Sequence, residues 1–118
     1  MKAKERKLEK TQKETSRYKN YRLNVCIDYG GRDEIVRAIK AIVGQGIKEE
    51  DVNQKLINSF MDTRNSLPLD YIIRTSGENR LSGFMPWASV YSELYFEKDY
   101  FPDFSPEKLH IALLEYSK

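Results

Sequence analysis

The sequence predicts an α/β fold, with a mostly parallel sheet and flanking helices. Short apolar runs typical of strands alternate with longer segments in which apolar residues recur at helical spacing. Their order is strand, helix, helix, strand, loop, strand, helix, which is typical of α/β proteins. A chain of 118 residues is expected to form one domain. We expect a charged helix or tail at residues 1–20 and a folded part at residues 21–118.

The first strand is predicted at residues 23–28, where Leu, Val and Ile alternate with Asn, Cys and Asp. Gly30 and Gly31 follow, either as a tight turn or as a phosphate cradle at the start of a helix. Apolar residues one turn apart then predict an amphipathic helix over residues 32–43 and a second helix over residues 49–61.

The second half of the chain predicts two more strands and a final helix. The apolar residues 71–73 read as a buried strand, followed at its C-terminal end by a polar, glycine-containing loop. Residues 94–96 are a third strand candidate. Ser105 and Pro106 are typical of an N-cap and the first position of a helix. Three strands make a thin sheet with two edges that need covering.

Composition excludes several classes of function. There are 20 Lys and Arg against 18 Asp and Glu, and the net charge of +2 is too small to indicate a nucleic-acid partner. Cys26 is the only cysteine, so neither an internal disulfide nor a Cys/His metal cluster is expected, which fits a reducing, cytoplasmic setting. No apolar run is long enough to span a membrane.

The loop that begins at Arg74 carries groups suited to a diphosphate. In open parallel sheets, ligands bind beyond the C-terminal ends of the strands, where this loop is predicted. It offers the guanidiniums of Arg74 and Arg80, three hydroxyls, and Gly77, which lets backbone N–H groups approach a ligand. The alternative is a solvated polar loop whose arginines pair with nearby glutamates, and composition alone favours that alternative.

Glu93 lies in an otherwise apolar stretch of the sequence. A carboxylate in such surroundings must be paired, protonated or bound to a cation. Mg²⁺ with a phosphate is one solution, because Mg²⁺ usually takes one or two carboxylates together with substrate oxygens. A salt bridge to Arg74 or Arg80 is the other, and physical reasoning alone favours it. His110, the only histidine, is interpreted as structural or exposed.

Four blocks of the sequence carry a recognisable pattern. Residues 74–84 read RTSGENRLSGF, and residues 91–96 read YSELYF. Upstream, residues 29–35 read YGGRDEI, and downstream residues 101–104 read FPDF. In content, order and spacing these blocks resemble the C-terminal half of the cis-prenyltransferases, which include the bacterial undecaprenyl diphosphate synthases; the family has Trp where the last block begins with Phe.

The resemblance implies a site and a reaction. Arg74, Arg80 and Ser82 would bind the diphosphate of isopentenyl diphosphate. Leu81 would contribute its backbone, and Glu93 would ligate Mg²⁺. The family condenses isopentenyl diphosphate onto an allylic diphosphate such as farnesyl diphosphate, and each new double bond is cis. Mg²⁺ and the arginines neutralise diphosphate charge. The resemblance also implies a homodimer with at most peripheral membrane contact.

The largest departure from the family is a missing segment. The family's Asp-Gly-Asn-x-Arg-Trp segment, which carries the essential aspartate, has no counterpart here, so no catalytic residue is assigned and the isolated chain is expected to be inactive. Three interpretations follow. The chain is part of a working cis-prenyltransferase, or a non-catalytic half that pairs with another polypeptide, or an unrelated α/β domain that binds a phosphorylated ligand. The first is favoured, because the isopentenyl diphosphate residues are all present.

Overall fold

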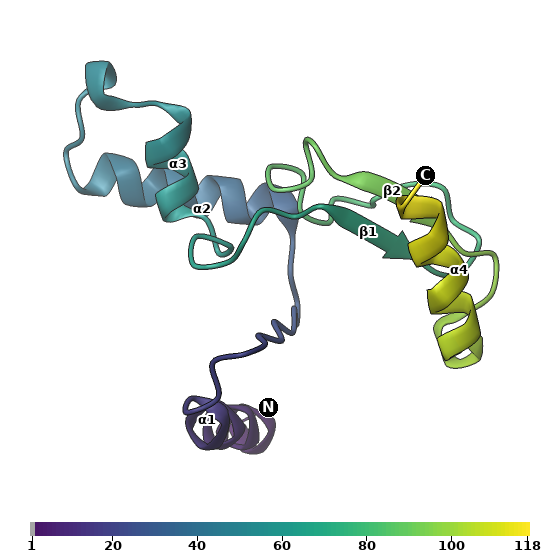
Figure 1. Ribbon diagram of the computed structural model, residues 1–118. Coiled ribbons are helices and arrows are strands. Elements are labelled where there is room, and N and C mark those ends of the chain that lie inside the picture. The colour runs from purple at the N-terminus through teal and green to yellow at the C-terminus, as the bar shows by residue number, and fades with distance from the viewer. Residues whose placement is uncertain (1) are drawn as a thin grey trace.

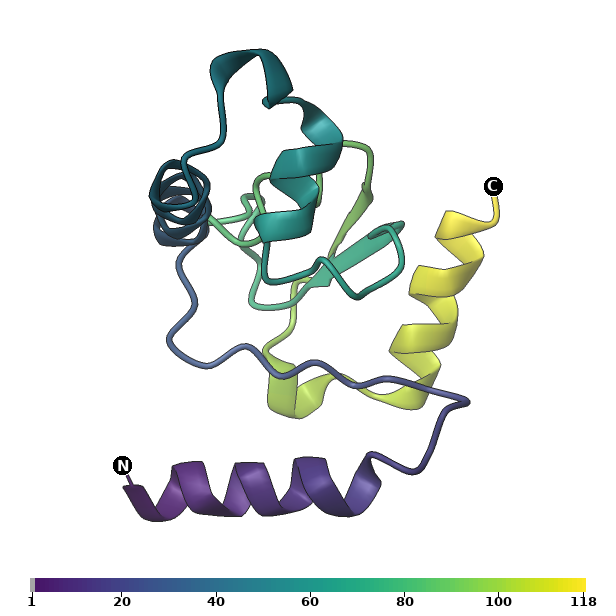
Figure 2. The same ribbon diagram turned by 90° about the vertical axis from the view of Figure 1, so that its left-hand side faces the viewer.

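The computed structural model describes residues 2–118 and has the predicted α/β character (Figure 1). A two-stranded parallel sheet and α4 lie on one side, and α2 and α3 lie on the other. The N-terminal helix α1 stands apart from both in Figures 1 and 2. In chain order the elements are α1 (Lys2–Thr15), α2 (Gly31–Gly44), η1 (Glu49–Asp51), α3 (Gln54–Phe60), β1 (Tyr71–Arg74), β2 (Glu93–Phe96), η2 (Phe101–Asp103) and α4 (Pro106–Tyr116).

The two strands of the sheet are confirmed where the apolar runs predicted them. They pair in parallel, with Tyr71 opposite Glu93 and Arg74 opposite Phe96. The last helix, α4, covers this sheet. Its Ala112 is fully buried, and the Tyr71 hydroxyl donates a 2.7 Å hydrogen bond to the Ala112 carbonyl. The hydroxyl of this half-buried tyrosine is thereby satisfied, and α4 is fixed to the start of β1.

The first predicted strand, at residues 23–28, is wrong. This segment is extended, but it forms no strand, and Leu23, Val25 and Ile27 are exposed. Apolar alternation favours an extended backbone, yet a strand also needs a neighbour for its N–H and C=O groups. The segment is tethered only through side chains, for example from the Asn24 amide to the Ser66 hydroxyl at 3.1 Å. The described residues therefore form a sheet of two strands, not three.

The helix predicted over residues 32–43 is confirmed as α2, but the single helix predicted over residues 49–61 is wrong. The chain makes the short turn η1, becomes extended, and begins α3 only at Gln54. Asn53 causes the restart, since its side-chain oxygen accepts the Leu56 N–H at 2.9 Å and so caps the new helix. Helix α2 packs on α3, and Ala38 and Ile42 of α2 are buried.

The two ends of the chain differ in how they are held. At α4 the predicted cap is confirmed, because the Ser105 hydroxyl accepts the Lys108 N–H at 3.3 Å. At the other end α1 is a highly charged helix with no buried residue. No helix within residues 2–118 is both long enough and apolar enough to cross a membrane.

Candidate anion-binding site

The predicted anion loop, residues 74–82, begins at the C-terminal end of β1 and borders a cavity of about 400 Å³. The end of β1, residues 81–84 and Tyr29 line this cavity. Arg74 and Ser82 give it a polar end, while Ile73, Leu81 and Phe84 give it apolar walls. The position beyond a strand's carboxyl end is the one expected for a ligand in a parallel sheet.

Arg74 organises this loop. Its Nη1 donates to the Ser82 hydroxyl at 2.9 Å and also to the Arg80 carbonyl. A guanidinium has five N–H donors, and both of these bonds use the same nitrogen. Within residues 2–118, Nε and Nη2 have no hydrogen-bond partner, so they are free to bind an anion. The structure thus brings Arg74, Ser82 and the Arg80 backbone together.

The Arg80 guanidinium is engaged differently. It pairs with the Glu78 carboxylate at 2.6 Å, and both side chains are exposed. The sequence left open whether the arginines of this loop pair with nearby glutamates, and Arg80 does so. An exposed pair of this kind contributes roughly 0–1 kcal/mol, so a ligand with more negative charge can replace Glu78.

Tyr29 closes one wall of the cavity and rests on a buried carboxylate. Its hydroxyl donates to Glu34, which is 3% exposed and also accepts the Asp62 N–H at 2.8 Å. Its ring meets Phe84 edge-on, with centroids 5.7 Å apart. Burial and the Glu34 carboxylate raise the pKa of Tyr29 well above its usual range, so this wall stays neutral.

Sequence reasoning missed Glu34 and Tyr29 as part of the site. A signal was present, because Glu34 shares a four-residue spacing with Ala38 and Ile42, the buried positions of α2. A charged residue on a buried helix face needs partners, and here the partners are a tyrosine hydroxyl and a backbone N–H.

Gly31 brings the start of α2 against the far end of the anion loop. A Cβ at this position would lie 2.1 Å from the Gly83 carbonyl oxygen and 2.3 Å from Pro86 Cδ. No other residue fits without displacing that backbone. The glycine is therefore explained by close packing between α2 and residues 83–86, a contact between segments far apart in the sequence.

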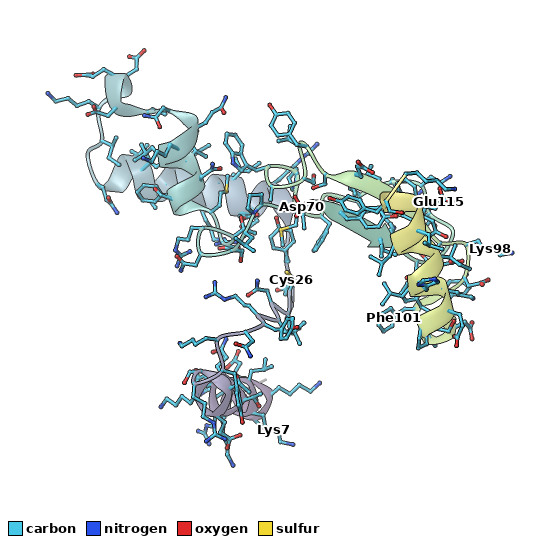
Figure 3. All side chains as sticks on the ribbon, in the orientation of Figure 1. Lys7, Cys26, Asp70, Lys98, Phe101 and Glu115 are labelled. Carbon is cyan, nitrogen blue, oxygen red and sulfur yellow. The ribbon has the colours of Figure 1, made fainter. Side chains whose placement is uncertain are left out.

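Glu93, the predicted Mg²⁺ ligand, lies at the other end of the sheet. It begins β2 opposite Tyr71, and its N–H donates to the Asp70 carbonyl at 2.9 Å. Arg74 is three residues further along β1, which is about 10 Å at the usual strand rise. Because Tyr71 and Arg74 are an odd number of residues apart, Arg74 lies on the opposite face of the sheet from Tyr71 and its neighbour Glu93. Figure 3 labels Asp70 at the start of β1 and Lys98 beyond the end of β2.

Glu93 therefore does not lie where it could share a Mg²⁺ ion with a diphosphate on Arg74. Glu93 is exposed and makes no salt bridge to Arg74 or Arg80. Residues 2–118 contain no group of three or more metal-ligating side chains.

Together these features define a class: an α/β protein in which an arginine organises a polar loop at the carboxyl end of a parallel strand. Comparison with known proteins makes this specific. A family model described as putative undecaprenyl diphosphate synthase matches residues 1–118. The isoprenyl transferase of Aquifex pyrophilus is 40% identical over 111 residues, which cover 94% of this chain and 47% of that protein. The chain belongs to the undecaprenyl diphosphate synthase family, the cis-prenyltransferases, as the sequence motifs predicted.

Solved structures agree with this assignment. A probable undecaprenyl diphosphate synthase from Campylobacter jejuni superposes with a TM-score of 0.78 at 28% identity, over 96% of this chain and 52% of that one. The lavandulyl diphosphate synthase of Lavandula x intermedia, solved with dimethylallyl diphosphate, gives a TM-score of 0.67 at 37% identity, over 76% and 41%. The chain spans about half the length of the curated relatives it matches.

Proposed function

We propose that this chain supplies the isopentenyl diphosphate site of a cis-prenyltransferase, which condenses isopentenyl diphosphate onto an allylic diphosphate such as farnesyl diphosphate. The observation that carries the proposal is the hydrogen bond between Arg74 and Ser82, which line a cavity together with apolar side chains. That cavity suits both parts of the substrate, because the diphosphate meets fixed donors and the five-carbon chain meets apolar walls.

The proposed site acts by binding and orienting. Arg74 offers Nε and Nη2 to diphosphate oxygens, while Ser82 and Arg80 supply further donors. Leu81 contributes backbone and one apolar wall of the cavity. These fixed positive charges hold isopentenyl diphosphate with its hydrocarbon directed away from the guanidiniums, which is the orientation that condensation requires.

Magnesium dependence is part of the proposal. When bound, Mg²⁺ would supply charge neutralisation for diphosphate oxygens. Glu93 is the proposed ligand in this chain. Because it lies away from the anion loop and residues 2–118 contain no group of three or more metal-ligating side chains, the remaining ligands of the proposed site come from elsewhere. A homodimer is likewise proposed by family resemblance.

A second candidate is a non-catalytic half that works with another polypeptide. The exposed alternating residues 23–28 favour it, because they present strand-like apolar side chains that nothing in residues 2–118 covers. Under either candidate, the chain alone is expected to form no product from isopentenyl and farnesyl diphosphates with Mg²⁺. Prenyl transfer by the isolated chain would contradict this expectation.

The experiment that tests the site is calorimetric titration of the chain with isopentenyl diphosphate. Arg74→Ala is expected to weaken binding by roughly 10- to 100-fold, since a charge-assisted hydrogen bond contributes about 1.5–3 kcal/mol. Arg6→Ala on the exposed helix α1 removes the same charge and is the matched control, expected to be neutral. Equal affinities for the wild type and Arg74→Ala would refute the proposed site.

A further inference from the structure

The turn at residues 97–99, directly after β2, carries the first half of the anion loop. The Ser76 N–H donates to the Asp99 carbonyl at 2.7 Å, and the Gly77 N–H donates to the Glu97 carbonyl at 3.0 Å. The Glu97 N–H donates in turn to the Arg74 carbonyl at 2.7 Å. We call residues 97–99 the support turn, because its backbone bonds both ends of the segment 74–77.

The segment that the support turn holds has an unfavourable backbone. Ser76 has a φ of 80° and Gly77 a φ of 70°, so two successive residues adopt left-handed conformations. Only Gly does so without strain. A Cβ on Gly77 would also lie 3.3 Å from the Lys98 carbonyl oxygen, which shows how closely loop and turn approach. The conformation at Ser76 therefore depends on the partners that fix it.

The support turn is itself held by charged side chains that do not line the cavity. Glu97 is 8% exposed, and its carboxylate accepts the Asp99 N–H at 3.2 Å. From the first turn of α4, Lys108 donates to the Asp99 carboxylate, and both side chains are partly buried. This ammonium lowers the pKa of Asp99, so the pair stays charged at neutral pH.

We infer that Asp99 and Lys108 are positioning residues for the diphosphate of isopentenyl diphosphate. The pair fixes the support turn, the turn fixes Ser76 and Gly77, and these fix the loop in which the Arg74 guanidinium is held. The inference rests on the proposed function, because the loop has a ligand to position only if it binds that diphosphate. It assigns to α4, which does not line the cavity, a part in substrate affinity.

The test is titration of four variants with isopentenyl diphosphate. Asp99→Asn and Lys108→Met are each expected to weaken binding roughly tenfold, which is the size of loss seen when a residue that orients a metal ligand is replaced. Lys108→Arg keeps the charge and is expected to stay near the wild type, and the exchanged pair D99K/K108D is expected to regain affinity. Lys118→Met, which breaks an exposed pair with Glu115, is the matched control.

Arg74→Ala separates the two hypotheses. If Arg74→Ala weakens binding and Asp99→Asn does not, the positioning inference is wrong while the proposed function stands. If Arg74→Ala has no effect, the proposed function itself fails. Wild-type affinity in Lys108→Met, or no recovery in D99K/K108D, also overturns the inference.

Amide hydrogen exchange supplies a readout that needs no ligand. In Asp99→Asn, which keeps the shape of the side chain, the Ser76 and Gly77 amides are expected to exchange at least about tenfold faster. Amides of the β1–β2 ladder, such as that of Tyr95, are expected to be unchanged. Unchanged protection at Ser76 overturns the inference. Loss of protection throughout the sheet overturns it too, because the pair would then be a general structural element.

Discussion

Replacement of Gly31 by alanine tests whether the start of α2 fixes the far end of the anion loop. The added Cβ would lie 2.1 Å from the Gly83 carbonyl oxygen and 2.3 Å from Pro86, both far inside van der Waals contact. The neighbours are backbone and a proline ring, which cannot rotate away. Overpacking of this kind costs about 1–3 kcal/mol. We expect Gly31→Ala to fall at the upper end of that range.

The assay is urea unfolding followed by circular dichroism. A loss of about 3 kcal/mol lowers the urea midpoint by roughly 1.5 M for a chain with an m-value near 2 kcal/mol/M. The chain also offers a matched control at the other end of the same helix. A Cβ on Gly44 has no atom within 4 Å, so Gly44→Ala is expected to raise stability by up to about 1 kcal/mol.

The same variant has a functional consequence under the proposed function. Gly83 follows Ser82, so a backbone shift at Gly83 displaces the hydroxyl that Arg74 holds. Gly31→Ala is therefore expected to weaken isopentenyl diphosphate binding as well as stability, whereas Gly44→Ala leaves binding unchanged. A Gly31→Ala protein with the wild-type urea midpoint would refute the packing argument.

Three further predictions concern side chains around the cavity. Arg80→Ala is expected to weaken isopentenyl diphosphate binding less than Arg74→Ala, because its guanidinium is exposed and already paired with Glu78; equal losses in a titration would contradict this. Tyr29→Phe removes a donor from buried Glu34 and is expected to cost about 1–3 kcal/mol in urea unfolding. Hydrogen bonds from Arg37, one of them 2.7 Å long, lower the pKa of Asp62 from its ordinary value of 3.8. Asp62 therefore stabilises the fold above pH 3.8, and this contribution is lost as the pH falls through the lowered pKa. Asp62→Asn should flatten that acid limb in thermal melts, and an unchanged limb would refute it.

Features set by neighbouring residues were predictable from the sequence. The cap of α4 depends on Ser105 and Pro106, and the sequence placed it correctly. The contact between Arg74 and Ser82 lies within one loop, and the sequence predicted both residues as parts of one anion site. The break before α3 was missed, because apolar spacing continues across Asn53 and only the cap geometry shows that the helix restarts there.

Features set by pairing between distant segments were not predictable. Strand register decides where Glu93 lies, and that register places it at the opposite end of the sheet from Arg74 although both flank the same loop region in sequence. The approach of Gly31 to Gly83 joins segments that no periodicity connects. The support turn was missed for the same reason, since its bonds to Ser76 are made by the backbone and leave no residue signature.

The extended segment at residues 23–28 leads to a last prediction. Leu23, Val25 and Ile27 are 88%, 65% and 64% exposed, and complete burial of such a side chain contributes about 1.5–3 kcal/mol. A sequence that alternates apolar residues this strictly is suited to burial against a further polypeptide segment, whether of a longer chain or of a partner. The Mg²⁺ site proposed at Glu93 fits the same view, because residues 2–118 contain no group of three or more side chains that could hold a metal ion.

Val25→Asp tests whether residues 23–28 are packed within the isolated chain or are covered only by a further polypeptide segment. In the isolated chain Val25 is mostly exposed, so the urea midpoint is expected to stay within the range of ordinary surface substitutions, about ±0.5 kcal/mol. When the chain is mixed with the N-terminal half of a full-length relative, such as the isoprenyl transferase of Aquifex pyrophilus, Val25→Asp is expected to abolish association measured by analytical ultracentrifugation. Arg6→Ala, a change on exposed α1, is the control for nonspecific effects. Wild-type association of Val25→Asp would mean that this segment is not the surface that the family's remaining half covers, and a large loss of stability in the isolated chain would mean that the segment is already packed.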